Sequence, residues 1–83
     1  AMICNSKGLH ARAAAKFCKT SSQFDAEIKV KRGDNEVSGR SIMGLMMLAA
    51  SVGTVIEINS AGPDAAAAID ALCNLIANKF DEE

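Results

Sequence analysis

Hydrophobic and polar positions alternate most clearly in the middle of this chain. Residues 25–31, DAEIKVK, place an apolar side chain at every second position and a charged side chain at each of the others. This two-residue period predicts a strand with one buried face, in a sheet whose other face meets solvent. The turn-forming residues of RGDNE, 32–36, follow, and a short strand around residues 37–38 completes the expected hairpin.

Two segments have a helical period instead. In residues 11–22, Ala14, Phe17 and Cys18 share one face, and basic side chains occupy the other. After Gly62-Pro63-Asp64, a good helix start, apolar residues form a continuous stripe. The positions in this stripe are Ala65, Ala68, Ile69, Leu72, Cys73, Ile76 and Phe80. The stripe predicts a packed amphipathic helix of about four turns.

Three shorter elements complete the pattern. Residues 2–5 and 53–59 are expected to be strands, and residues 42–50 a short helix. The element order is then β-α-β-β-α-β-α. The simplest α+β arrangement of these elements is a four-stranded, mostly antiparallel sheet with three helices on one face.

Length and composition narrow the function classes. The chain has 83 residues, a net charge of −1, three Phe and no Tyr or Trp. We therefore expect one domain over residues 1–83, without the basic face or stacking aromatics of a nucleic-acid binder. No apolar run approaches the roughly 20 residues that span a bilayer, and no signal peptide is evident, so membrane insertion is not expected.

The three cysteines bear on the compartment. Cys4, Cys18 and Cys73 are far apart and lack the C-x-x-C spacing of zinc and redox sites. They are expected to be small buried hydrophobic residues in a reducing cytosol, which favours a cytoplasmic protein. We expect neither a metal site nor a cofactor.

The only histidine, His10, stands immediately before the helix predicted over residues 11–22. The first N–H groups of a helix lack intrahelical partners and carry the positive end of its dipole. They favour a neutral, nucleophilic imidazole and would bind an attached anion such as a phosphoryl group. Arg12 can add a forked guanidinium contact. This setting suits a phosphohistidine intermediate, although a histidine here can equally be a capping or surface residue.

The segment GLHARAAAKF, residues 8–17, resembles the active-site segment of HPr, the phosphocarrier of the phosphoenolpyruvate-dependent phosphotransferase system. The family signature Gly-Leu-His-x-Arg matches residues 8–12. A second family signature resembles RSIMGLMMLAA, residues 40–50, and the two motifs stand at the family's spacing. The resemblance covers essentially the whole chain and implies the family's open-faced β-sandwich fold.

The resemblance also implies a function. Enzyme I would phosphorylate His10 on Nδ1, and the group would pass to a IIA-type domain, for sugar uptake or for regulation. Arg12 would steady the phosphoryl group. Ala13 departs from the family pattern, which often has proline there, and this departure points toward the nitrogen-related branch of the system.

Ser41 directly precedes the helix expected over residues 42–50, so its expected role is to cap that helix. The resemblance adds that the matching serine is a regulatory phosphorylation site in lineages with a dedicated serine kinase. A phosphate there would place negative charge beside the docking surface and would inhibit by repulsion.

The helix expected over residues 42–50 is too apolar for an ordinary surface helix. Ile42, Leu45 and Ala49 are expected to face the core. Three methionines are then expected to form a partly exposed docking patch near His10, although packing under another helix is the alternative. These methionines are Met43, Met46 and Met47, and the basic residues expected to rim the patch are Lys7, Arg12, Lys16, Lys19 and Arg40.

Three function classes follow. The first is a monomeric phosphocarrier acting through His10, with Lys16 among its docking residues. The second is a regulatory protein-interaction module tuned by Ser41 phosphorylation. The third, a hydrolase or transferase using His10 as a base, is disfavoured because no partner carboxylate or serine can be assigned to it.

Overall fold

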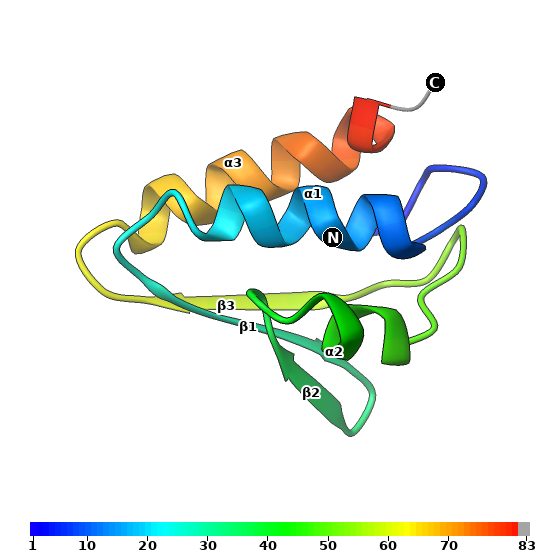
Figure 1. Cartoon of the computed structure of the whole chain (residues 1–83), viewed down its shortest axis with the longest axis horizontal. Coiled ribbons are helices and arrows are strands. Elements are labelled where there is room, and N and C mark those ends of the chain that lie inside the picture. The colour runs from blue at the N-terminus through cyan, green and yellow to red at the C-terminus, as the bar shows by residue number, and fades with distance from the viewer. Residues whose placement is uncertain (82–83) are drawn as a thin grey trace.

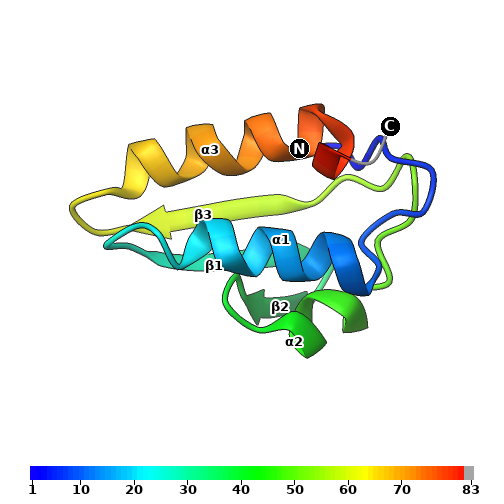
Figure 2. The ribbon, with the colours of Figure 1, turned by 45° about the horizontal axis from the view of Figure 1, so that its top comes forward.

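The computed structural model describes residues 1–81, in which α1 and α3 lie side by side over an antiparallel sheet (Figures 1 and 2). The short helix α2 packs against α1 and beside β2. The elements are α1 (Ala11–Ser21), β1 (Glu27–Arg32), β2 (Asn35–Ser38), α2 (Ile42–Met47), β3 (Glu57–Ala61), α3 (Ala65–Ala77) and the 3-10 turn η1 (Lys79–Asp81).

The sheet has the strand order β2-β1-β3, with both pairs antiparallel. Val30 at its centre is opposite Val37 on one side and Ile58 on the other. Ile28 and Val30 are buried against the helices, whereas Lys29 between them is exposed. The half-buried strand predicted from the alternating pattern is therefore confirmed.

The four-stranded sheet expected from the sequence is not found among the described residues, where three strands are present. Residues 1–3 do lie antiparallel to residues 53–56, but they form only an isolated bridge, Met2 with Val55. The pairing is short because both segments turn next to it. Asn5 begins a turn closed by its bond from the Gly8 N–H, and Gly53 has a left-handed φ of 86°.

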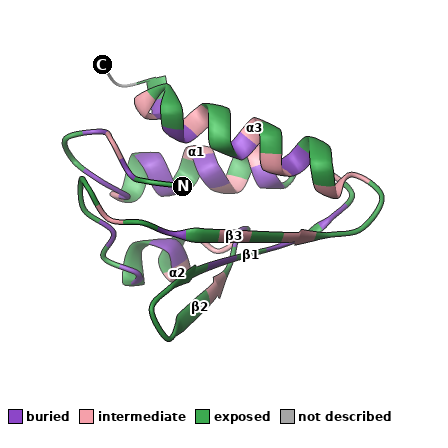
Figure 3. Cartoon of the chain, turned by 180° about the vertical axis from the view of Figure 1, so that it is seen from behind, coloured by how far each residue is buried: buried purple, intermediate pink, exposed green. Residues whose placement is uncertain are grey.

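The core lies between the helices and the sheet (Figure 3). The predicted apolar stripe of α3 is confirmed at Ala68, Leu72 and Ile76, which are buried. Cys73 is exposed, so the expectation of buried cysteines is wrong for this residue. The other two cysteines are partly buried, and all three are free. The largest buried apolar side chains are Ile3, Phe17, Val30, Leu45, Ile56, Leu72, Ile76 and Phe80.

The chain reverses direction after α3, at a point where the sequence pattern suggests a continuing stripe. Lys79, Phe80 and Asp81 have φ angles of 56°, 55° and 61°, a left-handed turn without glycine. Such residues cost about 1–2 kcal/mol each. The turn brings the Phe80 ring into the core, where it is fully buried, and the Lys16 Nζ donates to the Phe80 carbonyl at 2.6 Å. Burial of the ring offsets the strain.

Gly8 lies where the chain approaches the segment after α2 most closely. Its φ is 65°, and a Cβ built on it would lie 2.5 Å from the Ala50 carbonyl oxygen and 2.8 Å from the Ser51 Cα. The next residue, Leu9, donates its N–H to the same carbonyl at 2.8 Å. Only glycine satisfies both the left-handed conformation and the close approach.

We predict that Phe80→Ala lowers the free energy of unfolding by about 3–5 kcal/mol, because it removes a fully buried aromatic ring. Cys73→Ala is the matched control, since Cys73 is in the same apolar stripe but is exposed, and it should change stability by less than about 0.5 kcal/mol. Urea unfolding measures both values. Equal effects of the two substitutions would show that η1 does not anchor the ring as described.

We also predict that Gly8→Ala lowers the free energy of unfolding by about 3 kcal/mol, because a side chain would collide with backbone atoms that cannot move independently. Gly33→Ala is the control. Its φ of 59° is also left-handed, but no atom lies within 4 Å of the added Cβ, so only about 1 kcal/mol should be lost. A small loss for Gly8→Ala in urea unfolding would contradict the close approach.

Candidate functional site

His10 is the N-cap of α1 and sits at its exposed end, half-buried. Its backbone is extended, with φ −79° and ψ −177°, and its carbonyl accepts the Ala14 N–H as the first helical hydrogen bond. Its Nδ1 accepts the N–H of Arg12 at 3.3 Å. The lone pair of Nδ1 therefore points at the positive end of the helix. The expectation that His10 caps the first helix is confirmed.

The segment before His10 is held firmly from several sides. Leu9 is buried, and its N–H binds the Ala50 carbonyl. The buried Asn5 donates from Nδ2 to the Gly8 carbonyl at 2.7 Å, which closes the preceding turn. These contacts fix the backbone on the N-terminal side of the imidazole, as α1 fixes it on the other side.

Arg12 lies in the first turn of α1 and is exposed. Within residues 1–81, its guanidinium makes no hydrogen bond or ion pair with another side chain. Ala13, the next residue, is fully buried. It retains the backbone N–H that proline would lack, in the turn where helical N–H groups have no intrahelical acceptor.

A shallow depression of about 170 Å³ lies directly beside His10. Its walls come from the segment before α1 and from the segment after α2; the lining residues are Lys7, Leu9, His10, Ala49, Ala50 and Ser51. Sites that enclose small-molecule substrates usually hold about 300–1,000 Å³. This depression is smaller than such sites.

Ser41 is the N-cap of α2, as the sequence predicts. Its backbone is extended, with φ −109° and ψ 107°, and its Oγ accepts the Gly44 N–H at 3.0 Å. The helix itself ends at Met47, three residues before the predicted end. It stops there because Ala49 takes a left-handed φ of 52°, which turns the chain toward Gly8.

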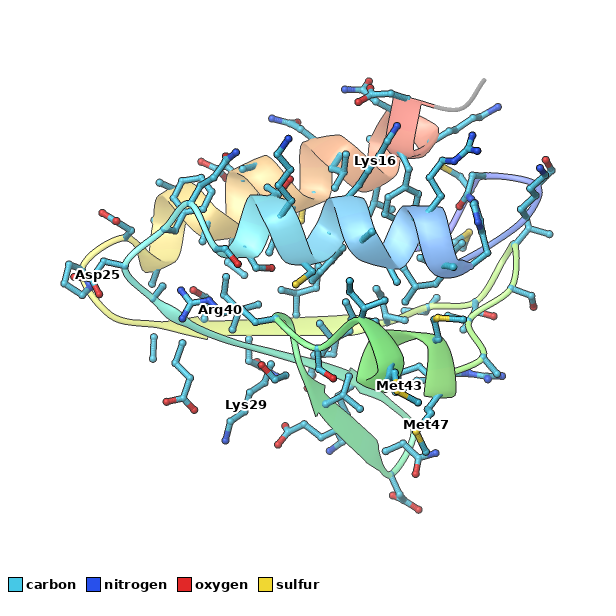
Figure 4. The ribbon with its side chains drawn as sticks, in the orientation of Figure 1. Lys16, Asp25, Lys29, Arg40, Met43 and Met47 are labelled. Atoms are coloured by element: carbon cyan, nitrogen blue, oxygen red, sulfur yellow. The ribbon has the colours of Figure 1, made fainter. Side chains whose placement is uncertain are left out.

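The exposed face of α2 carries the predicted methionines. The exposed fractions of Met43 and Met47 are 75% and 78%, and that of Met46 is 43%. Met43 and Met47 lie on the same side of the helix (Figure 4). Of the three residues expected to face the core, only Leu45 does so. Ile42, the first residue of α2, and Ala49 are exposed, and Ala49 lies beyond the helix because the helix ends at Met47.

Two of the basic residues expected around the methionines lie elsewhere (Figure 4). Lys16 points toward α3 and η1, where its ammonium group binds the Phe80 carbonyl at 2.6 Å. Arg40 donates from Nη2 to the carbonyls of Phe24 and Ala26, at 2.7 and 3.1 Å, and so braces the loop after α1. The structure therefore brings neither Lys16 nor Arg40 together with the methionines.

Several residues that support the site were missed from the sequence. Asn5 and Ala50 hold the segment before His10, and Arg32 donates from Nη1 to the carbonyls of Leu48 and Ala49 at the end of α2. The left-handed Gly8 in front of the histidine was the one available signal. The partner carbonyl of Ala50 is about forty residues away and has no sequence signature.

Two negative findings apply to the described part of the chain. Residues 1–81 contain no group of three or more His, Cys, Asp or Glu side chains that could hold a metal ion. Among the helices of the same residues, none is both long and apolar enough to span a membrane.

Comparison with known proteins places this arrangement in a family. A family model described as "PTS HPr component phosphorylation site" matches residues 1–78. The phosphocarrier protein HPr of Neisseria meningitidis serogroup A is 55% identical over 80 residues, which cover 96% of this chain and 90% of the relative. The phosphocarrier protein NPr of Shewanella violacea is 49% identical, with 96% and 88% covered.

Solved structures agree with the sequence comparison. HPr-C-His from Thermoanaerobacter tengcongensis superposes with a TM-score of 0.95 at 44% identity, covering 100% of this chain and 93% of that one. A structure described as an HPr dimer from the same organism has a TM-score of 0.81 at 44% identity, with 96% and 92% covered. The chain has its histidine at the start of α1 and matches these relatives along its length. It therefore belongs to the HPr family, whose members are phosphocarrier proteins of the phosphotransferase system and not enzymes.

Proposed function

We propose that His10 accepts a phosphoryl group on Nδ1 from enzyme I and passes it to a IIA-type domain. The observation that carries this proposal is the place of Nδ1, which faces the Arg12 N–H at the exposed start of α1. Enzyme I would draw the group from phosphoenolpyruvate, as in the family. The proposal covers both sugar uptake and nitrogen regulation, because the same nucleophilic transfer at His10 serves either pathway.

In the proposed reaction, the phosphoryl group moves intact from the donor to His10 and then to the acceptor. The Nδ1 lone pair attacks phosphorus, an N–P bond forms, and the bond to the donor's leaving group breaks. The next acceptor reverses the process and restores the free imidazole. Because Nδ1 then bonds to phosphorus, the Arg12 N–H loses its present acceptor and can donate to a phosphoryl oxygen instead. The helix dipole and the Arg12 guanidinium stabilise the added negative charge.

The methionine patch, which we define as Met43, Met46 and Met47, is proposed as the docking surface for both partners. Its side chains are exposed and flexible, which suits a surface that must fit two different partners in turn. Lys16 was expected to contribute to docking. Since its ammonium group is already engaged at Phe80, we propose that this residue supports the C-terminal turn, with any partner contact secondary.

A regulatory interaction module is the second candidate, favoured by the exposed patch together with the position of Ser41. Its Oγ lies at the start of the helix that carries the patch. Phosphorylation by a serine kinase would attach a doubly charged phosphoryl group to the capping oxygen, two residues before Met43. The helix would persist, and an acidic partner would be repelled.

We propose that the protein acts in the cytoplasm as a monomer, without nucleic-acid partners. A carrier that meets enzyme I and a IIA domain in turn needs the surface around His10 open to each of them. Self-association that covered the methionine patch would compete with both encounters.

We predict that phosphoenolpyruvate and enzyme I convert this protein to an acid-labile phospho-adduct, and that His10→Ala abolishes labelling while urea unfolding stays cooperative. Arg12→Ala should slow labelling about tenfold, because it removes a charged donor to the phosphoryl group. Lys29→Ala, which changes an exposed basic residue of β1 that belongs to neither the site nor the patch, is the control and should label normally. Enzyme I is first shown to be competent on the Neisseria meningitidis HPr. Labelling of the His10→Ala protein would refute the proposed site.

We predict that Met47→Asp raises the KM of enzyme I for this protein about tenfold, because a carboxylate on the docking surface disturbs an apolar contact. Val55→Asp is the matched control. Val55 is also apolar and exposed, at 63%, but it pairs with Met2 beyond the sheet edge. Equal effects of the two substitutions would reject the patch as the docking surface. If Met47→Asp removed cellular function and His10→Ala preserved it, the regulatory module would replace the carrier.

A further inference from the structure

Arg32, the last residue of β1, closes the C-terminal end of α2. Its Nη1 donates to the Leu48 carbonyl at 2.8 Å and to the Ala49 carbonyl at 3.1 Å. These carbonyls lie where a helix leaves oxygen atoms without intrahelical donors. An arginine is suited to binding two of them at once, because its donors are fixed in a plane.

The contact falls on a strained residue. Ala49 has a φ of 52°, a conformation that glycine adopts readily and alanine does not. The only other non-glycine residues with positive φ among residues 1–81 are in η1, where the buried Phe80 ring holds the turn. Ala49 has no such anchor, because its own side chain is exposed. The Arg32 guanidinium is the side-chain group that binds its carbonyl.

The strained residue leads directly to the phosphorylation site. The carbonyl of Ala50 accepts the Leu9 N–H at 2.8 Å, and Leu9 precedes His10. Ala49 and Ala50 also line the depression beside the imidazole. A change in the backbone at Ala49 would redirect the Ala50 carbonyl, and the segment before His10 would lose the bond that fixes it.

We propose that Arg32 is a positioning residue for His10: it holds Ala49 in the left-handed conformation, so that the Ala50 carbonyl binds the Leu9 N–H and fixes the histidine at the start of α1. Arg32 does not touch the reacting atoms. Its contribution to transfer rests on the proposed function, whereas its effect on the Leu9 N–H is a property of the unmodified protein.

The test is a double-mutant cycle between Arg32→Ala and Ala49→Gly. The first readout is the rate of amide hydrogen exchange at Leu9 in the unphosphorylated protein, measured by NMR. Arg32→Ala should speed this exchange about tenfold, because a charge-assisted contact is lost. Adding Ala49→Gly should return the rate to within about threefold of the starting protein, because glycine needs no help in the left-handed conformation.

The second readout is the rate of phosphorylation by enzyme I. Arg32→Ala should lower the maximal rate several-fold with little change in KM, since the methionine patch stays exposed, and Ala49→Gly should restore it. Arg32→Lys should lower the maximal rate less than Arg32→Ala does, because an ammonium group can bind one of the two carbonyls. The control is Lys31→Ala, which changes the neighbouring exposed basic residue of β1.

The outcomes separate the possibilities. Unchanged Leu9 exchange in the Arg32→Ala protein, an equal effect of Lys31→Ala, or failure of Ala49→Gly to rescue would each overturn the proposal. A uniform rise in exchange that includes core amides such as that of Leu72 would also overturn it, as the sign of a general stability effect. If the unsubstituted protein accepted no phosphoryl group, the proposed function would fail, and Leu9 exchange would still decide the role of Arg32.

Discussion

The hydrogen bond from the Leu9 N–H to the Ala50 carbonyl joins the two halves of the candidate site. One half is the start of α1 with His10, and the other is the end of α2 with the methionine patch. Gly8 makes the bond possible, because a side chain there would occupy the space of the Ala50 oxygen. Without this contact, the segment before His10 would lose its backbone bond to the segment after α2.

Much of the fold is predictable from local patterns. The alternation in residues 25–31 gives β1 its buried face, and the α3 stripe gives Leu72 and Ile76 their places in the core. The fourth strand was wrongly expected because a short apolar run carries no information about the turn that Asn5 begins. The end of α2 was placed too late for a similar reason, since alanine at position 49 gives no sign of a left-handed conformation.

The candidate site shows the same division. His10 and Arg12 can be found because both lie at the start of one helix and match a family signature. Arg32 and Ala50 could not be found, since their partners are distant along the chain and are backbone atoms, which look alike in every sequence. Lys16 was expected to take part in docking because of its charge, and its hydrogen bond to the Phe80 carbonyl could not be foreseen because that acceptor is a backbone atom 64 residues away.

The shallowness of the depression beside His10 has a kinetic consequence. In the proposed function, a surface open enough to admit two partner proteins also admits water, so transfer of a phosphoryl group from His10 would compete with its hydrolysis. Protein association constants of about 10⁵–10⁷ M⁻¹s⁻¹ make the waiting time depend on the concentration of the second partner. The fraction of phosphoryl groups that such a carrier delivers therefore depends on the rate of encounter with the acceptor relative to the rate of hydrolysis. This fraction rises with the concentration of the acceptor.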